Sequence, residues 1–321
     1  MPEPIVGLHH VTAIASDPQR SLDFYCEVLG LRFVKRTVNY DDPGSYHFYF
    51  GDDFGSPGSI LTFFAWPQAS RGHVGTGETS AVAFSVPAAS LSFWEQRILA
   101  AGSPLEHAGE RFGNRVLRLG DPDGMRIELV GTDNSLPVVE PRTSDIPTAH
   151  AIRGFDGVTL REAGFELTAH ILETMGFQRT GEENNRLRFE SAAKVPGNRI
   201  DILVQPQRVH GNMGAGTVHH IAFRAPSDNA QLQWREVISK VPLNITPVLD
   251  RSYFHSIYFR EPGGVLFEIA TDPPGFTFDE PVEHLGEALK LPSWLEKRRA
   301  EIEQELSPIE LPHLRKEQAD A

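Results

Sequence analysis

The chain repeats one short structural pattern four times, and this repetition constrains the fold more than any other feature of the sequence. Each copy, here called a module, opens with an alternating apolar run typical of a β-strand, continues with a helical pattern, and ends with three more strand-like runs. Modules 1 to 4 span residues 5–67, 79–133, 152–206 and 217–272. A single module is too small to bury both faces of its own sheet, so the modules are expected to pair around a shared cavity. We therefore predict an α+β fold in which four βαβββ modules form two curved mixed sheets, followed by a C-terminal helical tail.

A pair of adjacent histidines lies in the first predicted strand of modules 1 and 4. Residues 7–12 read GLHHVT, and residues 217–222 read TVHHIA. Two positions can be aligned through all four modules: the second residue of the histidine pair, and the last-strand position that Glu268 occupies. In module order, the aligned residues are His10 with Thr62, Ala81 with Glu128, Gly157 with Asp201, and His220 with Glu268.

This alignment predicts a metal site. Two imidazoles and one carboxylate can occupy one face of a metal and leave the opposite positions open, an arrangement that suits non-haem Fe(II). If module 1 pairs with module 4, the ligands are His10, His220 and Glu268. If modules pair in sequence order, Asp201 joins His220 and Glu268, which is also a workable ligand set, while His10 is left with Glu128. The spacing alone permits both arrangements, but the repeated histidine pair favours the first, because both histidines then serve one purpose.

Glu128 and Asp201 occupy the same aligned position in modules 2 and 3. Each is close in sequence to arginines, in RIELV and RIDIL, and an arginine there can pair with the carboxylate. We therefore interpret these two acids as structural ion-pair residues and not as metal ligands.

The composition is that of a soluble globular protein. Of the 321 residues 40% are hydrophobic and 23% are charged, and the net charge of −13 argues against binding to nucleic acid or to an anionic membrane surface. The single cysteine, Cys26, fits a reducing compartment and is expected to be a buried thiol in a helix. No signal peptide or apolar run of membrane-spanning length is found, so we expect a cytoplasmic protein.

The chain is expected to divide into an N-terminal domain (1–140), a C-terminal domain (150–275) and a tail (276–321). The Pro-rich, polar segment 134–150 is the predicted linker between the two domains. In the tail, residues 293–306 read SWLEKRRAEIEQEL and predict an amphipathic helix capped by Ser293. This helix could either cover the mouth of a cavity or pack elsewhere on the body.

Several motifs resemble the vicinal-oxygen-chelate superfamily, which includes glyoxalases, bleomycin-resistance proteins and extradiol dioxygenases. The hairpins DPDGMRIEL (121–129) and EPGGVLFEI (261–269) are similar to its last hairpin, and the resemblance covers roughly residues 5–275. Within the superfamily, the segments GLHHVTAI, KRTVNYDDPGSYHFYFGD, GSPGSILTFF and GTVHHIAF look most like hydroquinone and chlorohydroquinone ring-cleaving dioxygenases.

The resemblance implies an extradiol-type enzyme that inserts both atoms of O2 into a hydroquinone- or catechol-type ring. It implies Fe(II), or in some relatives Mn(II), held by His10, His220 and Glu268. It also implies second-sphere roles for further residues. These residues are Thr12, His9, His219, Arg251 and Tyr258.

The residues themselves give an independent, coarser expectation. Because side chains alternate along a strand, Thr12 should share the face of the ligand His10, whereas His9 and His219 should point away and orient the ligand strands. Tyr258 lies on the strand before Glu268, so its hydroxyl could reach the cavity, and Arg251 offers a cation for a phenolate. The alternative for Tyr258 and Arg251 is an ordinary cross-strand contact with a surface ion pair.

Two other functions compete with ring cleavage. A glyoxalase-like isomerase or lyase is expected to use more carboxylate ligands. A second carboxylate at position 62 would support that function, but Thr62 is a poor metal ligand. A metal-free, drug-binding protein has no need of the complete ligand positions in modules 1 and 4. The expected partners are thus a small aromatic substrate and O2, and a homo-oligomer is compatible with the sequence.

Overall fold

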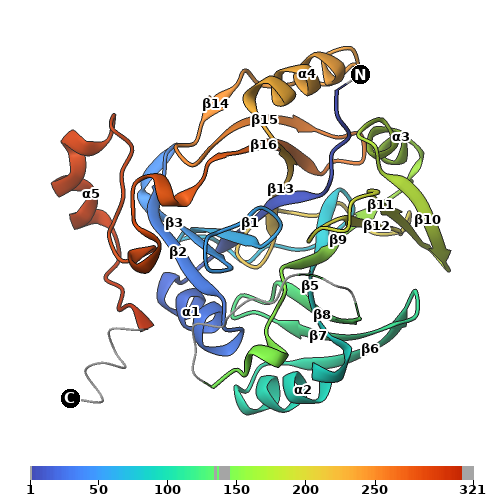
Figure 1. Ribbon diagram of the computed structural model, residues 1–321, viewed down its shortest axis with the longest axis horizontal. Helices are drawn as coiled ribbons and strands as arrows, with labels where there is room; N and C mark the ends of the chain where they lie inside the picture. Colours follow the sequence, from blue (N-terminus) through green and yellow to red (C-terminus); the bar gives the residue numbers. More distant parts are fainter. Residues whose placement is uncertain (1, 134–135, 137–144, 313–321) are drawn as a thin grey trace.

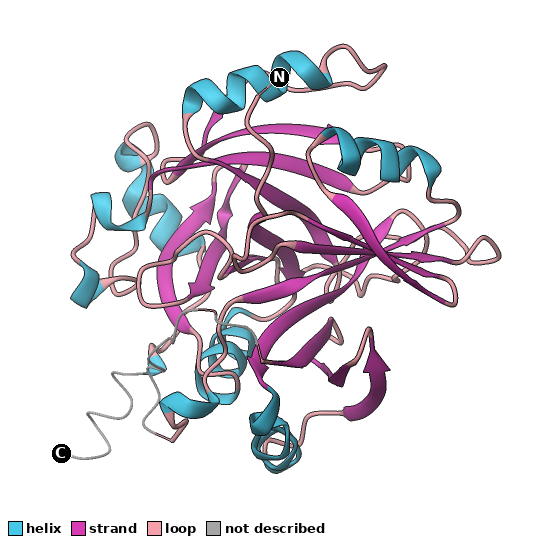
Figure 2. Cartoon of the chain, turned by 45° about the vertical axis from the view of Figure 1, so that its right-hand side comes forward, coloured by secondary structure: helices cyan, strands magenta, loops and turns pink. Residues whose placement is uncertain are grey.

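The computed structural model describes residues 2–133, 136 and 145–312. Within these ranges the chain forms two curved eight-stranded mixed sheets, with the helices on their outer sides (Figures 1 and 2). The α+β fold of four βαβββ modules in two curved sheets is thereby confirmed. Most of the predicted linker, 134–150, lies outside the described residues.

The first sheet joins module 4 to module 1. In spatial order its strands are β14 (Leu249–Asp250), β15 (Phe254–Arg260), β16 (Leu266–Pro274), β13 (Val218–Ala225), β1 (Leu8–Ala15), β4 (Ile60–Ala65), β3 (Asp42–Gly51) and β2 (Arg32–Asn39). The two modules meet where β1 pairs antiparallel with β13. The predicted pairing of modules 1 and 4 is therefore confirmed, and the alternative of pairing in sequence order is wrong.

The second sheet joins module 3 to module 2 in the same way. Its strands are β10 (Gln178–Glu183), β11 (Arg186–Glu190), β12 (Arg199–Val204), β9 (Phe155–Glu162), β5 (Glu78–Pro87), β8 (Arg126–Thr132), β7 (Asn114–Gly120) and β6 (Leu105–Arg111). Here β5 and β9 form the antiparallel junction. Each sheet thus takes one module from either side of the predicted linker, and the division into two sequential domains stays a prediction.

One main helix per module covers the outside of a sheet. These helices are α1 (Pro18–Asp23), which continues as the π-helical turn η1 (Phe24–Val28), α2 (Leu91–Ala100), α3 (Glu166–Thr174) and α4 (Asp228–Ile238). Side-chain caps start two of them, because Asp17 accepts from the N–H of Arg20 and Ser227 accepts from the N–H of Ala230. Cys26 is buried in η1, as predicted. Short 3-10 turns are η2 (Ala88–Ser90), η3 (Thr148–His150), η4 (Phe276–Phe278), η5 (Val282–His284) and η6 (Glu296–Arg298).

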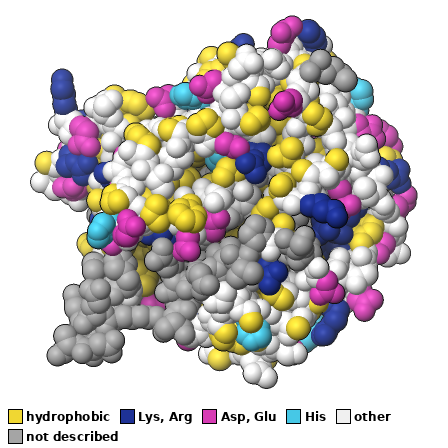
Figure 3. Space-filling view, in the orientation of Figure 1, with side chains coloured by type: hydrophobic (Ala, Val, Ile, Leu, Met, Phe, Trp, Pro, Cys, Tyr) yellow, Lys and Arg dark blue, Asp and Glu magenta, His cyan; other side chains and the backbone are white. Residues whose placement is uncertain are grey.

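The apolar core lies between the helices and the sheets. Its largest fully buried aromatic side chains include Trp94, Tyr25, Phe48, Phe63 and Phe155. On the face shown in Figure 3, lysines and arginines lie among acidic side chains instead of forming one continuous basic surface. Among the described helices, none is long and apolar enough to cross a membrane.

The tail packs along the outer edge of module 1. Lys35 of β2 is fully buried and binds Asp279, at 2.7 Å, and Glu280. The predicted helix over 293–306 is shorter than expected: a turn begins at Glu296 and leads into α5 (Arg299–Glu305). Ser293 is not its cap, because the residues from Ser293 to Leu295 still form a turn after Pro292.

Candidate metal centre

The structure brings the three predicted ligands together on neighbouring strands of the first sheet. His10 lies on β1, His220 on β13 and Glu268 on β16, and all three are almost fully buried. The Nε2 atoms of His10 and His220 are 3.4 Å apart and lie 3.3 Å and 2.9 Å from Oε2 of Glu268. Among the described residues, these three form the single cluster of at least three His, Cys, Asp or Glu side chains able to hold a metal ion.

Two β-bulges place the first histidine of each pair beside its neighbour. On β1, Leu8 and His10 face consecutive residues of β13, which leaves His9 as the extra residue. On β13, His220 and Val218 face consecutive residues of β1, which leaves His219 as the extra residue. A bulge interrupts side-chain alternation and re-aims a side chain. The expectation that His9 and His219 point away from the ligands by simple alternation is therefore wrong.

Each extra histidine touches the ligand histidine next to it. The Nδ1 atoms of His9 and His10 are 3.0 Å apart, and those of His219 and His220 are 2.8 Å apart. Burial and the neighbouring ligand lower the pKa of His9 well below its usual value and that of His219 to about 3, so both rings are neutral. A neutral acceptor at Nδ1 suits a ligand histidine that carries its proton on Nδ1 and offers Nε2 to a metal.

The surroundings of Glu268 fit its predicted place in a metal site. Ser256 donates a hydrogen bond to its Oε1, whereas Oε2 is buried without a well-directed hydrogen bond although two imidazole nitrogens lie near it. Burial alone would raise the pKa of Glu268, but His10 and His220 outweigh it and hold the pKa well below its usual value. An ionised carboxylate and two imidazole Nε2 atoms that converge on one point form a donor set that fits a divalent cation.

A cavity of about 420 Å³ opens onto this cluster. Its wall is largely aromatic, with polar and charged side chains among the aromatic ones. Residues that line it include His10, Tyr40, Asp41, His47, Tyr49, Phe64, Trp66, His219, His220, Arg251, Phe254 and Tyr258. In the tail, Trp294 packs against Tyr40 with ring centroids 5.6 Å apart, so the tail supports the cavity wall through this contact.

Arg251 and Tyr258 lie together in that wall. The guanidinium Nε of Arg251 is 3.3 Å from the hydroxyl of Tyr258, and its Nη1 is 3.4 Å from a carboxylate oxygen of Asp41. Tyr258 is also the cross-strand neighbour of Glu268. Burial and then Glu268 raise the pKa of Tyr258, so its hydroxyl keeps its proton. Tyr258 therefore makes the cross-strand contact that was considered as the alternative, and it also lies in the cavity wall.

Module 1 contains a series of side-chain hydrogen bonds that was not predicted from the sequence. The hydroxyl of Tyr49 lies 3.0 Å from Nδ1 of His47, Nε2 of His47 lies 2.8 Å from Oγ1 of Thr62, and Thr62 donates to Thr12 over 2.9 Å. Burial, with His10 nearby, lowers the pKa of His47 well below its usual value. Aligning YHFYFG with HSIYFR would have indicated His47, because Tyr49 and Tyr258 then coincide.

The corresponding positions of the second sheet hold ion pairs. Two nitrogens of Arg111 contact the carboxylate of Glu128 at 2.6 and 2.8 Å. Two nitrogens of Arg188 contact Asp201 at 2.8 and 3.0 Å. The structural interpretation of these acids agrees with both geometries.

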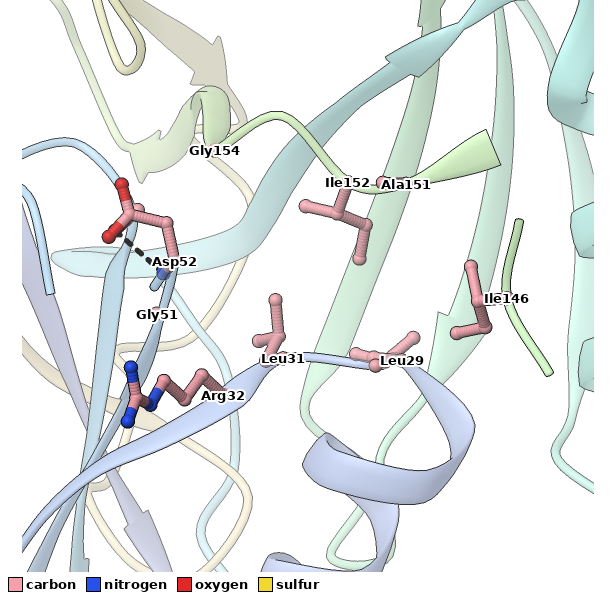
Figure 4. A pocket seen from close by; sticks show the side chains of 11 residues that line it. Leu29, Leu31, Arg32, Gly51, Asp52, Ile146, Ala151, Ile152 and Gly154 are labelled. Atoms are coloured by element: carbon pink, nitrogen blue, oxygen red, sulfur yellow. Dashed lines mark hydrogen bonds between the residues drawn. The ribbon is translucent and has the colours of Figure 1, made fainter. Parts of the chain in front are cut away.

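A much smaller hollow, shown in Figure 4, lies between the sheets. Its volume is about 20 Å³ and its wall includes Leu29, Leu31, Ile146 and Ile152. Because a single water needs a cavity of about 10–15 Å³, this hollow is too small for an organic ligand. The cavity at the histidines is therefore the better candidate for a substrate site.

Comparison with known proteins gives consistent matches over most of the chain. The family model described as "Glyoxalase/Bleomycin resistance protein/Dioxygenase superfamily" matches residues 7–129 and 162–269. A Bacillus subtilis protein named "Putative ring-cleaving dioxygenase MhqO" is 46% identical over 98% of this chain and 100% of its own length. The "Chlorohydroquinone/hydroquinone 1,2-dioxygenase" of Sphingobium indicum is 34% identical over 94% of this chain and 96% of its own.

Solved structures agree with the fold. The crystal structure of a "putative dioxygenase" from Bacillus subtilis has a TM-score of 0.92 and 45% identity, covering 96% of this chain and 98% of that one. Glyoxalase I from Zea mays has a TM-score of 0.59 and 14% identity, covering 83% of this chain and 92% of that one. At that identity the second match shows a shared fold alone.

Proposed function

Because the chain belongs to the glyoxalase/bleomycin resistance protein/dioxygenase superfamily, we propose that it is an Fe(II)-dependent, extradiol-type ring-cleaving dioxygenase. The proposed reaction inserts both atoms of O2 into a hydroquinone- or catechol-type ring. Its relatives named as ring-cleaving dioxygenases and as a hydroquinone dioxygenase support the reaction class.

One observation carries the proposal most directly. Oε2 of Glu268 is fully buried, and the Nε2 atoms of His10 and His220 converge on it from two neighbouring strands at 3.3 Å and 2.9 Å. These residues would hold Fe(II), with Mn(II) as the other candidate. The chemistry that the metal supplies there is electron transfer between an aromatic phenolate and dioxygen.

The chain's own groups bind and orient the substrate. The aromatic wall formed by residues such as Phe64, Trp66 and Phe254 suits a flat ring. Arg251 provides a fixed positive charge for a phenolate oxygen, while Tyr258 keeps a proton that it can donate at the ring.

The competing functions are less well supported. Position 62 carries a threonine hydrogen-bonded to Thr12 instead of a second carboxylate, which disfavours a glyoxalase-like isomerase or lyase. A metal-free binding protein gives no reason for a buried carboxylate and two buried imidazoles to converge on one point. The cytoplasmic location and the oligomeric state stay predictions.

The experiment is anaerobic reconstitution with Fe(II), followed by oxygen uptake over a panel of hydroquinones and catechols. We expect about one iron per chain and oxygen consumption that matches substrate loss one to one. Reconstitution with Mn(II) tests the second metal. A protein that binds iron but consumes no oxygen with any member of the panel would contradict the proposed reaction.

A further inference from the structure

The charged side chains of the cavity wall lie on two segments that meet at the protein surface. Asp41, in the turn between β2 and β3, and Asp42, at the start of β3, come from module 1, and Arg251, between β14 and β15, comes from module 4. Among the described residues of the wall, one is an arginine, two are aspartates and none is a lysine. Negative side chains therefore outnumber positive ones where the wall meets solvent.

Arg251 reaches from this surface to the interior of the cavity. Its Nε is 3.3 Å from the hydroxyl of Tyr258, and its Nη1 is 3.4 Å from a carboxylate oxygen of Asp41. The side chain of Arg251 is 22% exposed, whereas that of Asp41 is 78% exposed. Asp41 therefore balances the charge of the guanidinium from the solvent side.

Asp42 adds a second negative charge beside this ion pair. Its Oδ2 accepts a hydrogen bond from the indole Nε1 of Trp66 over 3.0 Å, and the hydroxyl of Ser45 lies 3.3 Å from the same oxygen. Trp66 also stacks on Phe64, with ring centroids 5.4 Å apart. The indole thus restrains the carboxylate of Asp42 at the edge of the aromatic wall, next to the space that a flat ring would occupy.

These charges bear on which aromatic rings can bind. A divalent metal together with the carboxylate of Glu268 would retain one positive charge, and a single phenolate would cancel it. A ring that also carries a carboxylate brings a second negative charge. Arg251 is the cation that could receive it, but Arg251 is already paired with Asp41, and Asp42 would repel it.

We propose that Asp41 is a specificity-determining residue that, together with Asp42, excludes rings bearing a carboxylate and favours dihydroxybenzenes with uncharged substituents. The inference rests on the proposed function, because it concerns the substrate of the same centre. Asp41 withholds the guanidinium of Arg251 from a carboxylate on the substrate, and Asp42 supplies the repulsion. Specificity of this kind comes from a repulsive element and needs no additional contact with the preferred ring.

The test uses two matched pairs of ligands: 2,5- and 3,4-dihydroxyphenylacetate, each with its uncharged amide. The acid and the amide have nearly the same shape, so the ratio of their dissociation constants isolates the effect of the charge. Each ligand is titrated calorimetrically into Fe(II)-loaded protein without oxygen. We expect the unaltered protein to prefer the amide, and Asp41→Asn to reduce this preference by about 5-fold, the upper end of the range for exposed ion pairs.

A matched control and a salt series accompany this comparison. Asp250→Asn removes an exposed acid next to Arg251 in sequence but outside the described cavity lining, and it should keep the preference of the unaltered protein. Added salt should weaken the preference of the unaltered protein, because exposed charges are screened. The salt series needs no substitution, so it tests the proposal even if a variant does not fold.

The possible results separate this inference from the proposed function. Equal affinity of the unaltered protein for acid and amide would overturn the inference, as would a preference that salt does not change. An unchanged preference in Asp41→Asn, or an equal loss in Asp250→Asn, would show that Asp41 is not the determinant. If neither amide binds and no hydroquinone or catechol supports oxygen uptake, the proposed function itself is refuted, independently of Asp41.

Discussion

Replacing Glu162 by Gln should stabilise the protein and remove a pH dependence of its stability. The side chain of Glu162 is fully buried, and neither carboxyl oxygen has a hydrogen-bond partner among the residues that the structure describes. The adjacent Glu261 accepts hydrogen bonds from the Thr168 hydroxyl at 2.6 Å and from the N–H groups of Gly263 and Val265 at 2.8 Å. Both oxygens of Glu261 are thus engaged in hydrogen bonds, whereas Glu162 keeps a proton. Burial and then the charge of Glu261 raise the pKa of Glu162 to about 8.

The size of the effect follows from this shift. In the unfolded chain a glutamate releases its proton above about pH 4.3, whereas the folded protein holds the proton of Glu162 up to about pH 8. Between these values the unfolded state binds fewer protons, so the free energy of unfolding falls as the pH rises, by about 1.4 kcal/mol per pH unit. Between pH 4.5 and pH 7 the loss is about 3 kcal/mol. Gln has the same shape and does not titrate, so the variant avoids this loss.

Urea unfolding at pH 5, 6, 7 and 8 measures the difference. We expect Glu162→Gln to exceed the unaltered protein by about 3 kcal/mol at pH 7, with the gap shrinking towards pH 5. The matched control is Glu173→Gln on α3, where the side chain is exposed and the gap should be close to zero at every pH. Parallel stability curves for the unaltered protein and Glu162→Gln would refute the assignment of the proton to Glu162.

Three further sets of variants test the proposed centre. Glu268→Gln keeps the side-chain shape but removes the anion, so bound metal per chain should fall sharply at an unchanged circular dichroism spectrum; full occupancy would exclude Glu268 as a ligand. His10→Ala and His220→Ala should lose metal to the same degree, because each ring offers one Nε2, and metal retained by only one of them would contradict a shared site. Tyr258→Phe removes one hydroxyl, so turnover should drop by about 10²–10⁴-fold while anaerobic substrate binding changes far less. Near-normal turnover with full metal would give Tyr258 a structural role.

The repeat in the sequence was sufficient to predict the strands and to favour the pairing of modules 1 and 4, but it could not exclude pairing in sequence order. Strand order depends on the antiparallel junction between β1 and β13, and this contact joins residues more than two hundred positions apart. A pattern of apolar residues carries no information about such a partner. For this reason the sequence leaves Asp201 as an alternative metal ligand, whereas the strand order places it in the second sheet.

The periodicity of the sequence does not predict local irregularities such as β-bulges. A bulge is a change in the hydrogen-bond ladder, so alternation did not predict that His9 contacts His10 or that His219 contacts His220. His47 was missed for a related reason. Its contacts with Thr62 and Tyr49 form only in the folded protein. Its counterpart in module 4 is Ser256, so aligning the modules by residue type does not identify His47.

The two sheets share one strand register, but the aligned carboxylates have different partners in each sheet. In the second sheet, bidentate arginine contacts satisfy Glu128 and Asp201, which makes the aligned positions part of a stable framework. In the first sheet, Oε2 of Glu268 instead lies 3.3 Å and 2.9 Å from the Nε2 atoms of His10 and His220. Since the same backbone accommodates a carboxylate paired with arginine, the replacement of arginine by two buried imidazoles is best explained by a metal that all three side chains would bind.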